Sequence, residues 1–176
     1  MHGFAESDEI AANAASVLPQ GPVTADFGNG KIAYHRFKEL VMPAIFPSEE
    51  WLRGLETKLN SDERYADVAK KWEGDLFIVV EPAGNLKEQI VLYFDLWHGQ
   101  CRNVEFNANL SSHSPVFTLT ATYDNIKDIL TGRMNPMTAM MTMKLKVKGN
   151  MGYMMRNVPT VLDFVRCAQE VTKEIL

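Results

Sequence analysis

The 176-residue sequence has few of the residues that build disulfide frameworks or metal centres. Cys101 and Cys167 are too few and too widely spaced for either, so we expect two buried thiols in a reducing, cytoplasmic location. The four histidines lack the spacing of metal ligands, lying at His2, His35, His98 and His113. The sequence therefore predicts no metal site.

Basic residues are not in excess, because 18 Lys and Arg face 22 Asp and Glu, giving a net charge of −4. Nucleic-acid binding without sequence preference needs a basic face, so we expect no nucleic-acid partner. Long hydrophobic runs are also missing: none approaches the ~18 apolar residues of a membrane-spanning helix. The start of the chain lacks the basic and apolar regions of a signal peptide. A hydrophobic fraction of 46% predicts one globular core instead.

Residues 1–45 differ in composition from the rest of the chain. An alanine-rich stretch is followed by Pro19–Pro22 and by Gly28–Gly30, which break regular structure. We interpret residues 1–45 as an N-terminal extension, with short helices near 7–17 and 32–41, and residues 46–176 as the domain. The extension could also support a homo-oligomer.

The domain begins with two expected helices. Ser48 is a good N-cap for a helix over 49–59, in which the apolar residues recur at helical spacing: Trp51, Leu52, Leu55 and Leu59. A second helix is expected over 63–71. Three more follow later in the chain, over 124–130, 135–143 and 158–175.

Four segments are rich in β-branched and aromatic residues and predict strands: 75–81, 89–97, 102–110 and 116–122. The strict alternation of residues 144–148 predicts a fifth strand. The alternation in the second and third strands predicts one buried and one solvated face for each. Loops 82–87 and 98–101 are short, so we expect consecutive strands to form antiparallel hairpins in a meander. In the last strand Lys144, Lys146 and Lys148 share one side. They either keep an exposed edge soluble or contact anionic headgroups transiently.

Methionine is concentrated in the C-terminal part, where eight of ten lie between Met134 and Met155. A methionine has three rotatable bonds and a polarizable sulfur, so such a surface adapts to varied apolar shapes. The cluster predicts a wall of an internal apolar cavity or a partner groove, and a flexible core without a ligand is the alternative.

The ordered set of these segments resembles the sterol carrier protein type 2 family from about Phe46 onward. The resemblance rests on four segments: Trp72-Glu73-Gly74, Ala121–Asp124 leading into 126–132, Asn135–Met141 and Lys144–Asn150. The resemblance implies an α+β fold, with a five-stranded, mostly antiparallel sheet covered by helices around a hydrophobic tunnel. It implies sterol, fatty acid or fatty acyl-CoA ligands, no cofactor, no metal and no catalytic residues. Residues 1–45 have no counterpart in it.

Our leading hypothesis is noncatalytic binding of apolar lipids. The expected lining consists of Phe94, Leu96, Phe117, Leu119, Met137, Met140, Met141, Met143, Met151, Met154, Met155, Val161, Leu162 and Val165. One alternative is an interaction or oligomerisation module that serves a lipid-metabolising enzyme. Another is an enzyme acting on lipid thioesters through His98 and Cys101, although two side chains three residues apart across a turn usually point apart.

Overall fold

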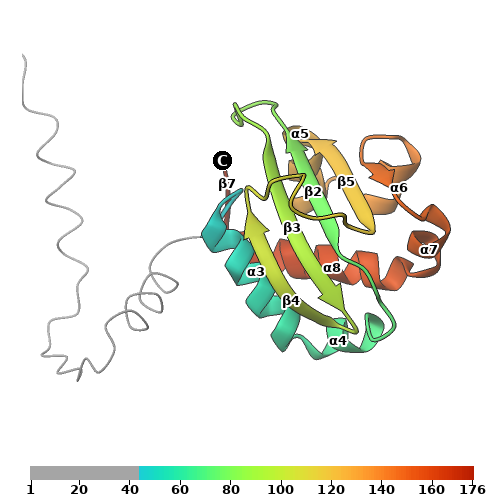
Figure 1. Ribbon diagram of the computed structural model, residues 1–176. Helices are drawn as coiled ribbons and strands as arrows, with labels where there is room; N and C mark the ends of the chain where they lie inside the picture. Colours follow the sequence, from blue (N-terminus) through green and yellow to red (C-terminus); the bar gives the residue numbers. More distant parts are fainter. Residues whose placement is uncertain (1–43) are drawn as a thin grey trace, which may run out of the picture. The chain divides into compact units, whose positions relative to one another are not determined.

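A five-stranded sheet is the centre of the domain, in a computed structural model that describes residues 44–176 (Figure 1). Its strands are β2 (Leu76–Glu81), β3 (Ile90–Trp97), β4 (Gln100–Phe106), β5 (Phe117–Thr122) and β6 (Lys146–Lys148). They lie in the order β4-β3-β2-β5-β6. All five predicted strands are present, and the α+β fold class is confirmed.

The sheet is mixed. The β2–β3, β3–β4 and β5–β6 pairs are antiparallel, as the short hairpin loops predict. The predicted meander ends at β4, because β5 returns to the other side of β2 and pairs with it in parallel, Leu76 opposite Phe117. This return is possible because the chain from 107 to 116 crosses the sheet before β5 begins.

Helices α3 (Glu49–Ser61) and α8 (Val158–Val171) cover one face of the sheet and lie behind the strands in Figure 1. Helix α3 begins as predicted, since the Ser48 side chain accepts a hydrogen bond from the Trp51 amide. Its four predicted apolar residues are all buried: Trp51, Leu52, Leu55 and Leu59. Helix α4 (Glu63–Val68) ends three residues before the predicted position.

The opposite face of β3 is not solvated, which corrects the expectation of a wet side. Val91 and Tyr93 are buried there with Phe77, and residues 107–116 supply the cover. His113 stacks on the Tyr93 ring with centroids 3.9 Å apart, and the Ala108 amide donates to the Val91 carbonyl. The strand predicted over 102–110 therefore stops at Phe106, and its remainder becomes this cover.

The C-terminal part holds helices α5 (Tyr123–Leu130), α6 (Pro136–Met141) and α7 (Met151–Arg156) before α8. Helix α7 was not predicted, and the terminal helix ends at Val171 instead of 175. Residues Glu174–Ile175 form β7, which pairs in parallel with β1 (Ile45–Phe46). The Tyr123 hydroxyl donates to the Leu176 carbonyl and holds this end against α5.

The helices expected near 7–17 and 32–41 lie outside the described residues. The boundary at residue 45 and a homo-oligomer through the extension therefore stay predictions. Within residues 44–176, no helix combines the length and apolarity required to cross a membrane.

Candidate functional site

An apolar cavity of about 90 Å³ lies between the sheet and the helices. Its lining comes from nearly every element of the domain: Phe46, Trp51, Tyr65, Trp72, Leu76, Ile78, Leu92, Leu96, Leu119, Ile126, Ile129, Leu130, Pro136, Met140, Leu145, Met154, Thr160, Val161, Phe164, Val165 and Ala168. The cavity is therefore a property of the whole fold.

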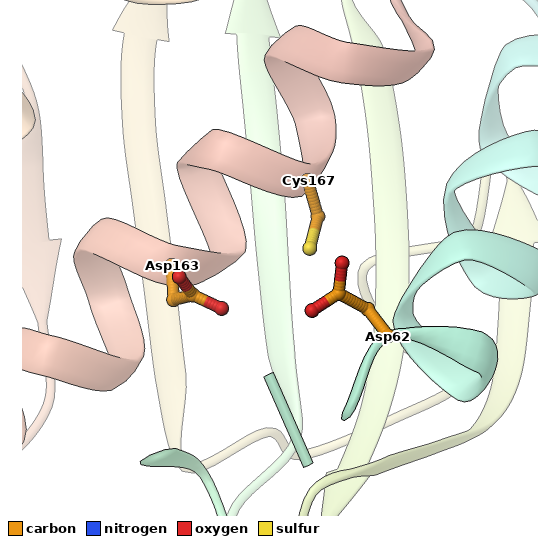
Figure 2. A group of neighbouring side chains, drawn as sticks. All are labelled: Asp62, Asp163 and Cys167. Carbon is orange, nitrogen blue, oxygen red and sulfur yellow. The ribbon is translucent and has the colours of Figure 1, made fainter. Parts of the chain in front are cut away.

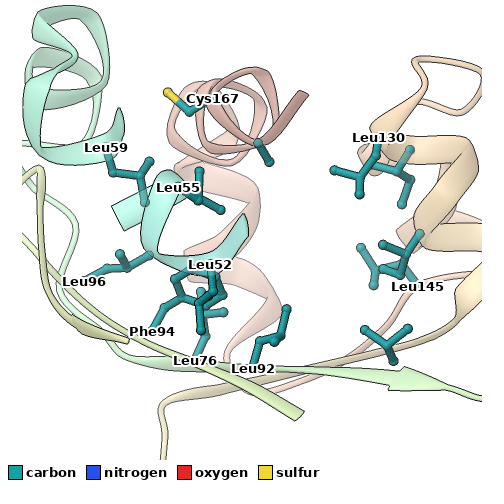
Figure 3. Packing of buried hydrophobic residues seen from close by; sticks show 14 of the residues in the cluster. Leu52, Leu55, Leu59, Leu76, Leu92, Phe94, Leu96, Leu130, Leu145 and Cys167 are labelled. Atoms are coloured by element: carbon teal, nitrogen blue, oxygen red, sulfur yellow. The ribbon is translucent and has the colours of Figure 1, made fainter. Parts of the chain in front are cut away.

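Helix α5 and the chain after α6 close the side of the cavity away from α3. The buried face of α5 contributes Ile126, Ile129 and Leu130, which recur at helical spacing. In Figure 3 Leu130 and Leu145 lie on one side of the interior, and Leu52, Leu55 and Leu92 lie on the other. The two sides belong to one continuous hydrophobic core.

The polar groups of the lining are mostly used within the protein. Trp51 Nε1 donates to Thr172 Oγ1, and Trp72 Nε1 donates to the Gly74 carbonyl, each at 2.9 Å. The Thr160 hydroxyl donates to the Val68 carbonyl at 2.9 Å. Burial raises the pKa of Tyr65 well above its ordinary value, so its phenol stays neutral. The interior therefore suits a ligand that is itself apolar.

Six of the fourteen predicted residues line this cavity: Leu96, Leu119, Met140, Met154, Val161 and Val165. Phe94 and Phe117 lie elsewhere in the core and are fully buried, and Met137 is partly buried beside it. The other five are exposed: Met141, Met143, Met151, Met155 and Leu162. Neighbouring methionines thus face opposite ways, because Met140 and Met154 are 5% and 1% exposed, whereas Met141 and Met155 are 78% and 48% exposed.

The other fifteen lining residues were not predicted. The apolar face of α5 carries a clear signal, since Ile126, Ile129 and Leu130 show the spacing of an amphipathic helix. Trp51 was expected on the buried face of its helix and was assigned to packing alone, and Tyr65 and Trp72 were not expected at the cavity. Their position at the cavity depends on how α3 and α4 sit on the sheet, which no local pattern encodes.

His98 and Cys101 do not form a nucleophile and base. Burial raises the pKa of the Cys101 thiol to about 12, which disfavours the reactive thiolate. His98 Nε2 instead lies 2.7 Å from Glu73 Oε1, on an exposed turn. The thiol is therefore buried, whereas the imidazole lies at the surface beside Glu73.

A second group of titratable side chains lies where α4 meets α8 (Figure 2), and their ligand atoms lie within 4.8 Å: Asp62, Asp163 and Cys167. The Arg166 guanidinium already occupies this cluster. Its Nη2 donates to Asp62 at 2.7 Å and to Asp163 at 2.8 Å. A metal ion would have to displace it, and burial raises the pKa of Cys167 to about 11. We interpret the cluster as an ion-pair network that ties α4 to α8.

Asp62 should make this network sensitive to acid. Hydrogen bonds from Arg166 and Lys58 hold the pKa of Asp62 well below its ordinary value. A carboxylate with a lowered folded-state pKa stabilises the fold above its unfolded pKa, and that contribution is lost as the pH falls. The free energy of unfolding, measured by urea titration, should therefore decrease as the pH falls below about 4.

Asp62→Asn is the matched variant for this prediction, because asparagine still caps α4 where Asp62 accepts from the Tyr65 amide. The variant should be less stable than the natural protein at pH 6 and lose less stability between pH 4 and pH 3. Equal losses in both proteins would show that Asp62 does not carry the effect.

Comparisons with known proteins agree with this geometry. The sequence profile of the SCP-2 sterol transfer family matches residues 53–161. A crystal structure of sterol carrier protein 2 is 28% identical, with a TM-score of 0.65 over 71% of this chain and 98% of that chain. A conserved hypothetical protein from Thermus thermophilus, solved in solution, is 28% identical with a TM-score of 0.64, covering 71% of this chain and 88% of that one.

Sterol carrier protein 2 from Yarrowia lipolytica shares the fold, at 21% identity and a TM-score of 0.50 over 70% of this chain and 93% of that one. A search of curated protein sequences finds no match. The profile covers more than half of the chain, and the fold of the sterol carrier protein 2 structure is similar to that of residues 44–176. The chain therefore belongs to the SCP-2 sterol transfer family.

Proposed function

We propose that this protein binds apolar lipids in the cavity between the sheet and its helices, without catalysing a reaction. The observation that carries the proposal is the lining, in which aliphatic and aromatic side chains from both layers surround one interior space. Family membership supports lipid binding and transfer in general. Fatty acids, fatty acyl-CoA and sterol-like molecules are the ligand classes we propose. The two free, buried cysteines support a cytoplasmic location.

The energetics favour binding from water. Each buried methylene contributes about 0.8 kcal/mol, and an acyl chain offers many. Part of this gain offsets the ordering of the ligand, so micromolar affinity is within reach. The acyl chain of a lipid in a membrane is already out of contact with water, so the free energy of moving it from the bilayer into the cavity is near zero. A protein of this kind therefore suits exchange of lipids more than tight storage.

Binding a long chain requires the cavity to expand. Its volume of about 90 Å³ is well below the ~300–1,000 Å³ of typical ligand sites. Met140 and Met154 are the adaptable part of the lining, because their side chains can change rotamer at low energetic cost. They lie on α6 and α7, which have only six residues each. We propose that these helices move outward when a ligand enters.

The test is native mass spectrometry of the gently purified full chain, before and after incubation with palmitate, palmitoyl-CoA or cholesterol. We expect a stoichiometric mass increase, from copurified lipid or from one of the added ligands. Lysozyme, incubated with the same ligands, controls for nonspecific adducts. The absence of a stoichiometric complex with all three ligand classes would overturn the proposal.

A further inference from the structure

The C-terminal part carries an unbalanced positive charge. Between Asp128 and Asp163 the sequence has five basic residues and no acidic one, although the whole chain is at −4. The five are Arg133, Lys144, Lys146, Lys148 and Arg156. Arg133 lies 3.8 Å from Asp128. The other four are exposed and have no ion pair within residues 44–176.

The same segment exposes apolar side chains. Four methionines turn away from the core, namely Met141, Met143, Met151 and Met155, with 40–78% of their surface exposed. Leu162 on α8 is 39% exposed. Of the nine large hydrophobic residues exposed in the described part of the chain, these make up five. Exposed apolar side chains gathered in one segment of the chain indicate a site of interaction.

These residues come from consecutive elements at one edge of the domain. Helices α6 and α7 lie on the same side in Figure 1, and β6 between them in sequence is the outer strand beside β5. Lys146 and Lys148 flank Val147, which faces the core. The lysines need not point the same way as the methionines, because electrostatic attraction to a charged surface acts over about 10 Å.

We propose that the outward-facing methionines Met141, Met143, Met151 and Met155, with Lys144, Lys146 and Lys148, dock the protein on an anionic membrane surface. We call these seven residues the Met-Lys surface. Lysines near such a surface are attracted to its headgroups, and exposed apolar side chains enter the headgroup boundary. A second copy of the chain is a poorer partner, because a twofold contact would place like charges against each other.

The Met-Lys surface is the outer side of a wall of the cavity. Met140 and Met154 line the cavity one residue before Met141 and Met155, and Leu145 lines it between Lys144 and Lys146. Docking would therefore place the adaptable wall against the bilayer that supplies the lipid. This role rests on the proposed lipid binding, whereas the docking itself does not require it.

Vesicle flotation of the full chain tests the docking. Vesicles of phosphatidylcholine alone are compared with vesicles that contain 30% phosphatidylglycerol. We expect binding to the anionic vesicles only, weakening as salt is raised. The Lys144→Gln, Lys146→Gln, Lys148→Gln triple variant should bind about 100-fold more weakly, at about fivefold for each lysine. Met141→Ser with Met143→Ser should weaken binding on the order of tenfold.

Matched controls separate position from total charge and apolarity. Lys70→Gln, Lys71→Gln and Lys87→Gln remove the same charge from exposed positions elsewhere. Leu110→Ser with Val116→Ser removes two apolar side chains that are each 49% exposed. Both should leave flotation unchanged, and unfolding midpoints check that every variant is folded. Equal losses in the control and test triples would overturn the docking surface.

Other outcomes are equally decisive. Lipid uptake by mass spectrometry without flotation on anionic vesicles would overturn docking and leave the proposed function standing. Flotation on anionic vesicles without lipid uptake would overturn the proposed function and leave the docking standing. A dimer in analytical ultracentrifugation that Met141→Ser with Met143→Ser dissociates, without flotation of the natural chain, would assign the surface to self-association and overturn membrane docking.

Discussion

Replacing Asp163 with alanine is expected to destabilise the fold by about 3 kcal/mol. The Asp163 carboxylate is 2% exposed, accepts hydrogen bonds from Arg166 Nε and Nη2, and forms an ion pair with Arg64 Nε, each at 2.8 Å. Removing it leaves Arg166, which is 24% exposed, with one compensating carboxylate fewer at the junction of α4 and α8. Urea unfolding followed by tryptophan fluorescence measures the effect.

Asp67→Ala is the control for this prediction. Asp67 pairs with Lys70 at 2.9 Å, but its side chain is 73% exposed. An exposed pair contributes about 0–1 kcal/mol, so the variant should stay close to the natural protein. Similar unfolding free energies for the two variants would show that the buried network does not hold α8 in place.

Helix α3 could be predicted from the sequence because its signals are local. Ser48 caps it and the apolar residues recur at helical spacing, so both the start and the buried face are confirmed. The order of the strands in the sheet was harder to predict from the sequence. The β2–β5 pair joins segments about 40 residues apart, and its parallel direction depends on the path of 107–116 across the sheet. No residue in β5 encodes which neighbour it will have.

The methionines of the site likewise show what the sequence alone does not predict. Their number predicted an adaptable apolar wall, but composition does not say which side of a six-residue helix faces inward. Pro136, Ala139 and Met140 form the buried face of this helix, whereas Met141 faces out. Four of the five exposed predicted residues belong to the Met-Lys surface, for which we propose membrane docking instead of cavity lining. The ion-pair network was not predicted, because Asp62 and Asp163 are 101 residues apart and become neighbours only when α4 packs on α8.

Filling the cavity should abolish most lipid binding, and Ala168→Phe is the variant of choice. Ala168 lies on α8, is 3% exposed and lines the cavity, so a phenyl ring would occupy space of about 90 Å³ that the ligand must use. Excluding two or three methylenes costs about 1.6–2.4 kcal/mol, which corresponds to roughly 15- to 60-fold weaker binding. Displacement of a fluorescent fatty acid measures the affinity.

Leu162→Phe on the same helix is the matched control, because Leu162 is 39% exposed and does not line the cavity. It should bind fatty acid as the natural protein does, whereas Ala168→Phe should also lose about 1–3 kcal/mol of stability through overpacking. Measuring affinity well below the unfolding midpoint separates the two effects. Unchanged affinity in folded Ala168→Phe would mean that lipid binds outside this cavity. Weaker fatty-acid binding in both variants would instead place the ligand on both sides of α8. Weaker binding in Ala168→Phe, with unchanged binding in Leu162→Phe, assigns the ligand to the interior that the sheet and helices enclose.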